Sequence, residues 1–157
     1  GRSTAFLQKY RTENQVILLN DDEILESFAL AAQYRALFDF VGAAKVEFNP
    51  IIRGAGFLGV CSADLSIDDT LYEVKTVSRK ITGRDIRQLM VYLALQYSTG
   101  IRRWISAGFF NPRKSLHYKF SIEHLIYRTS GGRAVPDVFG AIIDFLSTRG
   151  VEIDTEF

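Results

Sequence analysis

The chain has 157 residues, of which 47% are hydrophobic and 24% are charged, and its formal net charge is +1 at pH 7. This composition is close to that of an average globular domain, so it excludes a disordered or fibrous protein. The single cysteine, Cys61, excludes an internal disulfide and a four-cysteine iron–sulfur cluster, and it favours a cytoplasmic location. No apolar run approaches the roughly 20 residues that span a bilayer, so we expect no membrane partner.

The length suits one domain, which we place over residues 1–157 with a core at about 21–120. The chain begins with Gly1 rather than with Met, which leaves open that it is a fragment of a longer polypeptide.

The first predicted element is a helix over residues 21–42. Asn20 or Asp21 can cap it, acidic residues fill its first turn, and Gly42 ends it. The preceding segment, 15–19, fits either a short strand or a helix. The apolar residues of the helix recur near helical spacing and predict a stripe made of Ile24, Leu25, Phe28, Ala31, Ala32, Leu37 and Phe38.

Three strands are predicted next. Residues 45–52 alternate between apolar and polar types, with Pro50 favouring an edge or a bend, and a glycine-rich bend follows at 53–59. The other two strands lie near 63–68 and 71–77 and are joined by a tight turn of two aspartates.

A second helix is predicted over residues 83–98, followed by strands at 104–110 and 116–120. Ser121 can cap a short helix, and residues 135–147 form a last amphipathic helix. This order of elements predicts an α/β (α+β) fold with a mixed β-sheet flanked by helices.

The charge is distributed unevenly along the chain. Residues 73–119 hold ten Lys and Arg against two Asp and Glu, a net +8, whereas residues 1–72 carry −4 and residues 120–157 carry −3. Such a basic block is either a solvated face or a surface that binds a phosphate-rich partner.

Charged residues interrupt the apolar strands of the predicted hairpin. Glu73 and Lys75 are two apart, so they project from the same face of one strand. A turn centred between Asp68 and Asp69 places Asp64 directly opposite Glu73 in an antiparallel pair. Two facing carboxylates repel each other unless a cation lies between them, and Lys75 supplies only part of that compensation.

This grouping suits the hydrolysis of a phosphodiester. Carboxylate oxygens are the ligands that Mg²⁺ prefers, and Mg²⁺ usually takes one or two of them together with waters and phosphate oxygens. A metal held there stabilises charge on the phosphate and activates water, while a neighbouring lysine assists that water. An exposed ion-pair cluster is the competing interpretation of the same residues.

The helix that follows the hairpin adds a second signal. Gln88 and Tyr92 are four apart, so they share one helix face that can point toward the strand ends. The ordered set Asp64, Glu73-Val74-Lys75, Gln88 and Tyr92 resembles the PD-(D/E)XK nuclease superfamily, in its branch with a QxxxY motif that includes RecB-type and lambda-exonuclease-type nucleases. The resemblance covers roughly residues 21–110 and implies a restriction-endonuclease-like core.

The resemblance also implies a role for each matching residue. Asp64 and Glu73 bind Mg²⁺ or Mn²⁺, and Lys75 serves the attacking water. Gln88 and Tyr92 orient the active site or contact the nucleic-acid backbone.

Nucleases of this superfamily often add an acidic residue from the first helix. Glu26 is the best match as a third metal ligand, with Glu23 second and Glu47 third. The chain departs from the superfamily pattern at Ala63, which stands where the motif has its proline.

Basic residues around the start of the second helix are expected to bind the phosphate backbone, because helix N-termini favour anions. The expected nucleic-acid-binding residues are Arg79, Lys80, Arg84, Arg87 and Arg113, with Arg102, Arg103 and Lys114 extending the same surface.

The expected function is therefore a Mg²⁺-dependent deoxyribonuclease active in repair, restriction or antiviral defence. DNA is the expected partner, RNA is not excluded, and a homo-oligomer or a larger nuclease system fits the superfamily. The alternatives are a catalytically inactive module of the same fold that binds nucleic acid or assembles complexes, and a small scaffold with a structural ion-pair cluster.

Overall fold

The computed structural model describes residues 19–55 and 59–148, so the expectation for residues 15–18 lies outside the described chain. Along the described part the elements are α2 (Asp21–Val41), β1 (Val46–Phe48), β2 (Ile51–Ile52), β3 (Cys61–Ser62), β4 (Leu65–Ile67), β5 (Thr70–Val74), α3 (Gly83–Ser98), β6 (Ser106–Asn111), β7 (Leu116–Ser121), α4 (Ile122–Ser130) and α5 (Val135–Thr148).

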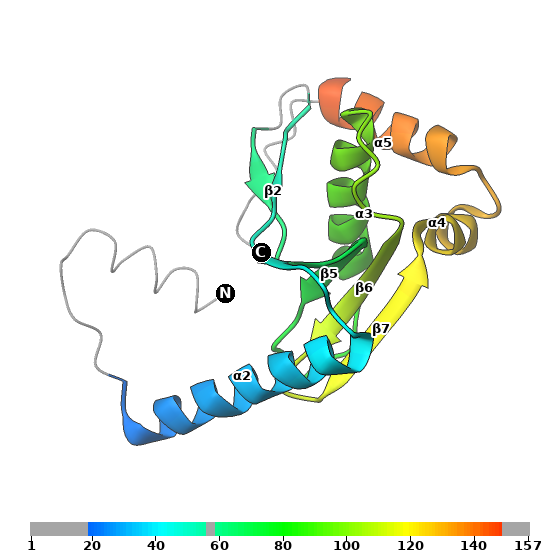
Figure 1. The fold of residues 1–157 in the computed structure, drawn as a ribbon. Helices are drawn as coiled ribbons and strands as arrows, with labels where there is room; N and C mark the ends of the chain where they lie inside the picture. Colours follow the sequence, from blue (N-terminus) through cyan, green and yellow to red (C-terminus); the bar gives the residue numbers. More distant parts are fainter. Residues whose placement is uncertain (1–18, 56–58, 149–157) are drawn as a thin grey trace.

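Five strands form the main sheet in the order β1-β4-β5-β6-β7. The central pair β5–β6 is parallel, and the other neighbours are antiparallel. Helix α3 makes the crossover between the parallel strands, and Figure 1 shows it lying along one face of the sheet beside α5. The predicted mixed sheet with flanking helices is confirmed.

The two faces of the sheet bury separate clusters of side chains, because neighbouring residues of a strand point to opposite faces. Leu71 joins the cluster under α3, α4 and α5, whereas the next residue, Tyr72, joins the cluster under α2. The first cluster includes Leu71, Leu89, Leu93, Ala107, Phe109, Ile126 and Phe139. The second consists of Leu37, Leu65, Ile67, Tyr72 and Phe110.

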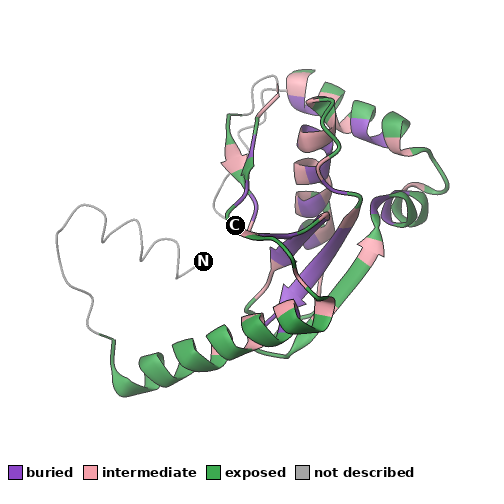
Figure 2. Cartoon of the chain, viewed as in Figure 1, coloured by how far each residue is buried: buried purple, intermediate pink, exposed green. Residues whose placement is uncertain are grey.

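Helix α2 has the predicted ends but not the predicted burial. Asn20 closes a capping box with Glu23, and Gly42 ends the helix with a φ of 64°. A helix of 21 residues is about 30 Å long, and only its C-terminal half packs on the sheet. Leu25 is therefore 67% exposed and Phe28 70% exposed (Figure 2), so the expected stripe is buried only near Leu37.

The strand predicted over residues 45–52 is divided between two sheets. Asn49 has a φ of 51° and is followed by Pro50, so the chain turns there. Before the turn, β1 pairs with β4 in the main sheet, and after it β2 pairs with β3 in a separate two-stranded sheet. The strand predicted over 71–77 also ends early, at Val74, which leaves Val77 42% exposed.

Within the described residues, no helix combines the length and apolar character that a bilayer crossing requires.

Gly108 is required by a close approach in the centre of the sheet. A Cβ atom at this position would lie 2.2 Å from the Tyr118 carbonyl oxygen and 2.7 Å from the Tyr72 ring. Since the first contact is with backbone, the sheet itself would have to move.

We expect Gly108→Ala to lower the free energy of unfolding by about 1–3 kcal/mol, measured by chemical denaturation. Gly140→Ala is the matched control. Gly140 lies on the exposed face of α5, away from the helix ends, and a Cβ there would meet nothing within 4 Å. That variant should raise stability by about 0.5–1 kcal/mol. Equal effects of the two substitutions would contradict the packing described for Gly108.

Candidate active site

The β4–β5 hairpin has the register that the sequence predicts. Leu65 pairs with Tyr72, and Ile67 pairs with Thr70 across the tight turn. One further step of this register sets Asp64 against Glu73, just beyond the first residue of β4.

Hydrogen bonds to the backbone fix the position of Asp64. Its Oδ2 accepts a hydrogen bond of 2.7 Å from the Val74 amide, and its own carbonyl accepts one of 3.0 Å from the Asn49 amide. Asp64 is thus held between the end of β1 and the end of β5.

Glu73 is a buried carboxylate with one oxygen paired and the other unpaired. The residue is only 2% exposed. Its Oε1 lies 2.8 Å from the Lys75 Nζ, which confirms that both side chains share one face of the strand. Its Oε2 is buried with no hydrogen-bond partner among the residues that the structure describes. A buried acceptor without a partner is costly, so this oxygen is poised to bind a donor or a cation.

The pKa values of the two acids reflect their shared burial. Burial, followed by the charge of Asp64, raises the pKa of Glu73 to about 7, although Lys75 opposes the shift. Burial also raises the pKa of Asp64, against the hydrogen bond from the Val74 amide, the charge of Lys75 and a hydrogen bond from the Glu73 carboxyl when that group is protonated. The pair therefore resists carrying two negative charges at once.

A chain of hydrogen bonds connects Lys75 to helix α3. The Lys75 Nζ donates to Gln88 Oε1 at 3.2 Å, and Gln88 Nε2 donates to Tyr92 Oη at 3.1 Å. Because an ammonium only donates, Gln88 must turn its carbonyl oxygen toward Lys75 and its amide nitrogen toward Tyr92. Burial raises the pKa of Tyr92 to about 12, so its phenol stays protonated. The structure thus brings Glu73, Lys75, Gln88 and Tyr92 together as predicted.

Asp85 is a site residue that the sequence reasoning missed. It is 1% exposed, and its Oδ1 lies 3.5 Å from the Lys75 Nζ. Arg79 donates to both of its oxygens, at 2.6 and 2.8 Å. The available signal was the Thr82-x-x-Asp85 spacing of a capping box at the predicted start of the helix.

A groove lies between α2 and β1. It has a volume of about 570 Å³. Burial, followed by the charge of Asp64, raises the pKa of the Tyr34 phenol, which lines the groove. The lining residues are Ser27, Leu30, Ala31, Tyr34, Arg35, Phe38 and Phe48.

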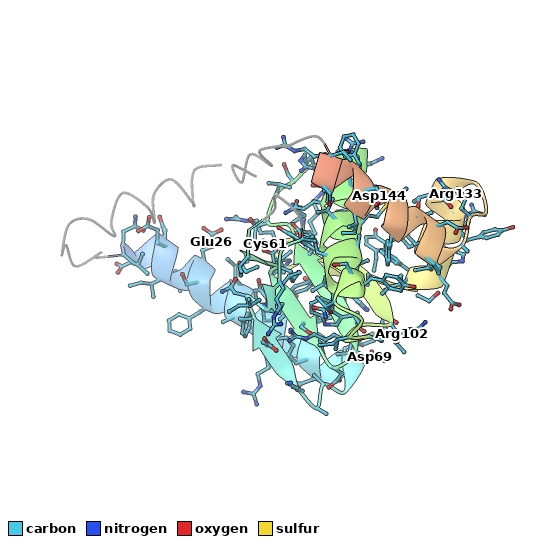
Figure 3. All side chains as sticks on the ribbon, turned by 90° about the horizontal axis from the view of Figure 1, so that it is seen from above. Glu26, Cys61, Asp69, Arg102, Arg133 and Asp144 are labelled. Atoms are coloured by element: carbon cyan, nitrogen blue, oxygen red, sulfur yellow. The ribbon has the colours of Figure 1, made fainter. Side chains whose placement is uncertain are left out.

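None of the three candidates for a third metal ligand joins Asp64 and Glu73. Glu26, labelled on α2 in Figure 3, forms an ion pair with Arg113. Glu23 belongs to the α2 capping box, and Glu47 pairs with Arg103. The partners of Glu26 and Glu47 depend on how α2 and β1 dock, which spacing along the chain does not specify.

Arg79 and Arg113, both expected to bind nucleic acid, are held by carboxylates in the structure. Arg79 binds Asp85, and Arg113 binds Glu26. Lys80, Arg84 and Arg87 are exposed around the first turns of α3, as expected for a basic surface.

The donor atoms of Asp64 and Glu73 are of the kind that a divalent cation prefers. The unpaired Oε2 of Glu73 and the neighbouring Asp64 provide hard oxygen donors, and Mg²⁺ commonly takes two carboxylates in a protein. Within residues 19–55 and 59–148, however, no three His, Cys, Asp or Glu side chains gather into a group that could hold a metal ion.

Comparisons of the chain with profiles of known protein families, with curated proteins and with solved structures found no match. The resemblance to PD-(D/E)XK nucleases, and the restriction-endonuclease-like core it implies, therefore remain predictions. Functional inference for this chain depends on the geometry of Asp64, Glu73, Lys75, Gln88 and Tyr92.

We predict that burial of Glu73 makes the stability of the metal-free protein depend on pH. Its pKa is raised from 4.5 to about 7, so the folded state binds more protons than the unfolded state between these values. The contribution is fully present below the lower pKa and is lost as pH rises through the upper one. The free energy of unfolding should fall over this range by up to about 1.4 kcal/mol per pH unit.

Chemical denaturation in chelator across this pH range measures the slope. Glu73→Gln should reduce it strongly, because an amide carries no ionisable proton there and only the raised pKa of Asp64 remains. The matched control Glu123→Gln, on the exposed surface of α4, should retain it. A slope of unchanged size in Glu73→Gln would show that another group causes it.

Proposed function

We propose that the protein is a divalent-metal-dependent nuclease that hydrolyses phosphodiester bonds in DNA. The observation that carries this proposal is the buried, unpaired Oε2 of Glu73 beside Asp64, with the Lys75 ammonium 2.8 Å from the other oxygen. An unpaired buried acceptor costs free energy in the resting protein, and a cation relieves that cost.

Each site residue would have a separate role in the proposed hydrolysis. Asp64 and Glu73 would hold Mg²⁺ or Mn²⁺, which when bound neutralises charge on the phosphate and lowers the pKa of water. Lys75 supplies a positive charge for the negative charge that develops on the phosphate, and its N–H groups can orient the attacking water. Gln88 and Tyr92 restrict the movement of the Lys75 side chain.

A basic surface supports DNA as the substrate. Residues 73–119, which include all of α3 and every site residue except Asp64, carry a net charge of +8. Lys80, Arg84 and Arg87 are exposed at the N-terminal end of α3, where the helix dipole also favours an anion. Phosphate groups would therefore be attracted to the same end of the helix that faces Lys75.

The test is a cleavage assay on linear, circular, single-stranded and duplex DNA with Mg²⁺ or Mn²⁺. We expect Asp64→Asn, Glu73→Gln and Lys75→Met each to lower the rate by about 100-fold or more, because each removes a ligand or the charge next to the phosphate. Asp69→Asn is the matched control, since Asp69 lies on the tight turn and contacts Lys119 and Thr70 instead.

Undiminished cleavage by Asp64→Asn or Lys75→Met would contradict the assignment. Cutting of a covalently closed circle would further establish endonucleolytic activity, since an exonuclease needs an end.

A second prediction concerns binding to DNA. In the Asp64→Asn background, Lys80→Ala and Arg87→Ala should each reduce the slope of log K against log salt by about 1, equally for different sequences. Arg133→Ala, on the acidic C-terminal part of the chain, is the control and should leave the slope unchanged. Unaltered slopes for Lys80→Ala and Arg87→Ala would show that DNA does not bind at this end of α3.

The competing function is a catalytically inactive module of this fold that binds nucleic acid or assembles a complex. The observation that favours it is the engagement of Glu26 and Glu47 by arginines, which leaves Asp64 and Glu73 without a third acid from α2 or β1. Nucleic-acid binding without cleavage by the wild-type protein, with no metal bound, would support it.

Repair, restriction and antiviral defence are the biological settings that we propose for a nuclease of this kind. A cytoplasmic location and assembly into a homo-oligomer or a larger nuclease system also stay proposals.

A further inference from the structure

The ammonium of Lys75 lies among three oxygen acceptors. They are Glu73 Oε1 at 2.8 Å, Gln88 Oε1 at 3.2 Å and Asp85 Oδ1 at 3.5 Å. At 3.5 Å the contact with Asp85 is an ion pair rather than a hydrogen bond. Two of the acceptors belong to the ordered set that the sequence identified, and the third, Asp85, does not.

Asp85 is held more firmly than a helix cap requires. Its Oδ2 accepts from the Thr82 amide at 2.7 Å and from the Thr82 hydroxyl at 2.8 Å, which completes the cap of α3. Arg79 adds a bidentate pair with both oxygens. The contacts with Thr82 are sufficient for the helix cap, so the two hydrogen bonds from the Arg79 guanidinium have a role other than capping.

That role concerns the contact of Asp85 with Lys75. The Asp85 side chain is 2% exposed and that of Lys75 16% exposed, so their contact is poorly screened by water. Arg79 prevents the carboxylate from rotating away, and it also compensates its charge. Asp85 therefore presents a fixed oxygen to Lys75 instead of forming a tight ion pair with it.

We propose that Asp85, clamped by Arg79, is a positioning residue that holds the Lys75 ammonium in place for the reaction, an inference that rests on the nuclease activity proposed above. The need for it follows from Glu73, which contacts Lys75 through one oxygen and has the other available to a cation. Glu73 would hold Lys75 less tightly if its carboxylate also bound a cation. Asp85 and Gln88 would then keep the ammonium in place, with an N–H group free to reach water or phosphate.

The test measures Lys75 directly. Exchange of the lysine ε-ammonium protons with water is followed by ¹⁵N-edited NMR of the full chain, with the Lys75 signal assigned by its loss in Lys75→Met. Asp85→Asn should accelerate this exchange several-fold, because it removes the negative charge of an ion-pair partner 3.5 Å from the ammonium. Asp69→Asn, which alters the 3.9 Å contact of Asp69 with Lys119, should leave the Lys75 signal unchanged.

A second experiment distinguishes the role of Asp85 in positioning Lys75 from its role in capping α3. Thr82→Ala removes one hydrogen bond of the cap while the Thr82 amide and Arg79 still hold Asp85, so it should lower the melting temperature without changing Lys75 exchange. In cleavage assays, Asp85→Asn should lower kcat about tenfold or more while KM for DNA changes less than about twofold, because Lys75 acts on charge that develops in the transition state.

Arg79→Gln provides a further variant if Asp85→Asn fails to fold, since Arg79 is half exposed and its loss frees Asp85 to rotate. It should accelerate Lys75 exchange in the same direction. Unchanged Lys75 exchange in these variants overturns the inference, whether or not the wild-type protein cleaves DNA. Absence of cleavage by the wild-type protein, together with faster exchange in the variants, overturns the proposed function and leaves the positioning of Lys75 standing.

Discussion

The burial of the Glu73 carboxylate beside Asp64 is the constraint on which the rest of the site depends. A carboxylate that is 2% exposed and adjacent to another acid is unfavourable unless cations and donors compensate it. Lys75 provides the nearest compensation, and its own charge is balanced by Asp85, which is balanced in turn by Arg79. Charges of alternating sign thus extend from the buried acid to the surface.

The fold places this network at one end of the central parallel strands. Strands β5 and β6 are parallel, so the connection between them must cross the sheet, and α3 makes that crossing. The first turns of α3 therefore lie at the carboxyl end of β5, next to Lys75. Ligands of open α/β sheets generally bind at this end of the strands, where loops and helix N-termini meet. The hairpin with β4 adds Asp64 at the same end.

Sequence patterns predicted the parts of the site that depend on local geometry. The turn at Asp68 and the two-residue period of a strand specify the β4–β5 register, and the four-residue spacing of Gln88 and Tyr92 specifies a shared helix face. The packing of elements that are distant in sequence was not predicted. The angle of α2 decides that Glu26 meets Arg113, and the fold of the loop before α3 decides that Arg79 returns to Asp85. The exposed half of α2 was not predicted for the same reason. The apolar pattern of the helix does not say how far the sheet beneath the helix extends.

The most direct test of the account is calorimetric titration of the wild-type protein with Mn²⁺ near pH 7 in buffers of different ionisation enthalpy. Because the pKa of Glu73 is raised to about 7, binding should be saturable and should release a fraction of a proton from the site. Glu73→Gln should abolish both the binding and the proton release. Absence of saturable Mn²⁺ binding to the wild-type protein, or binding that Glu73→Gln leaves intact, would contradict a metal site at Asp64 and Glu73.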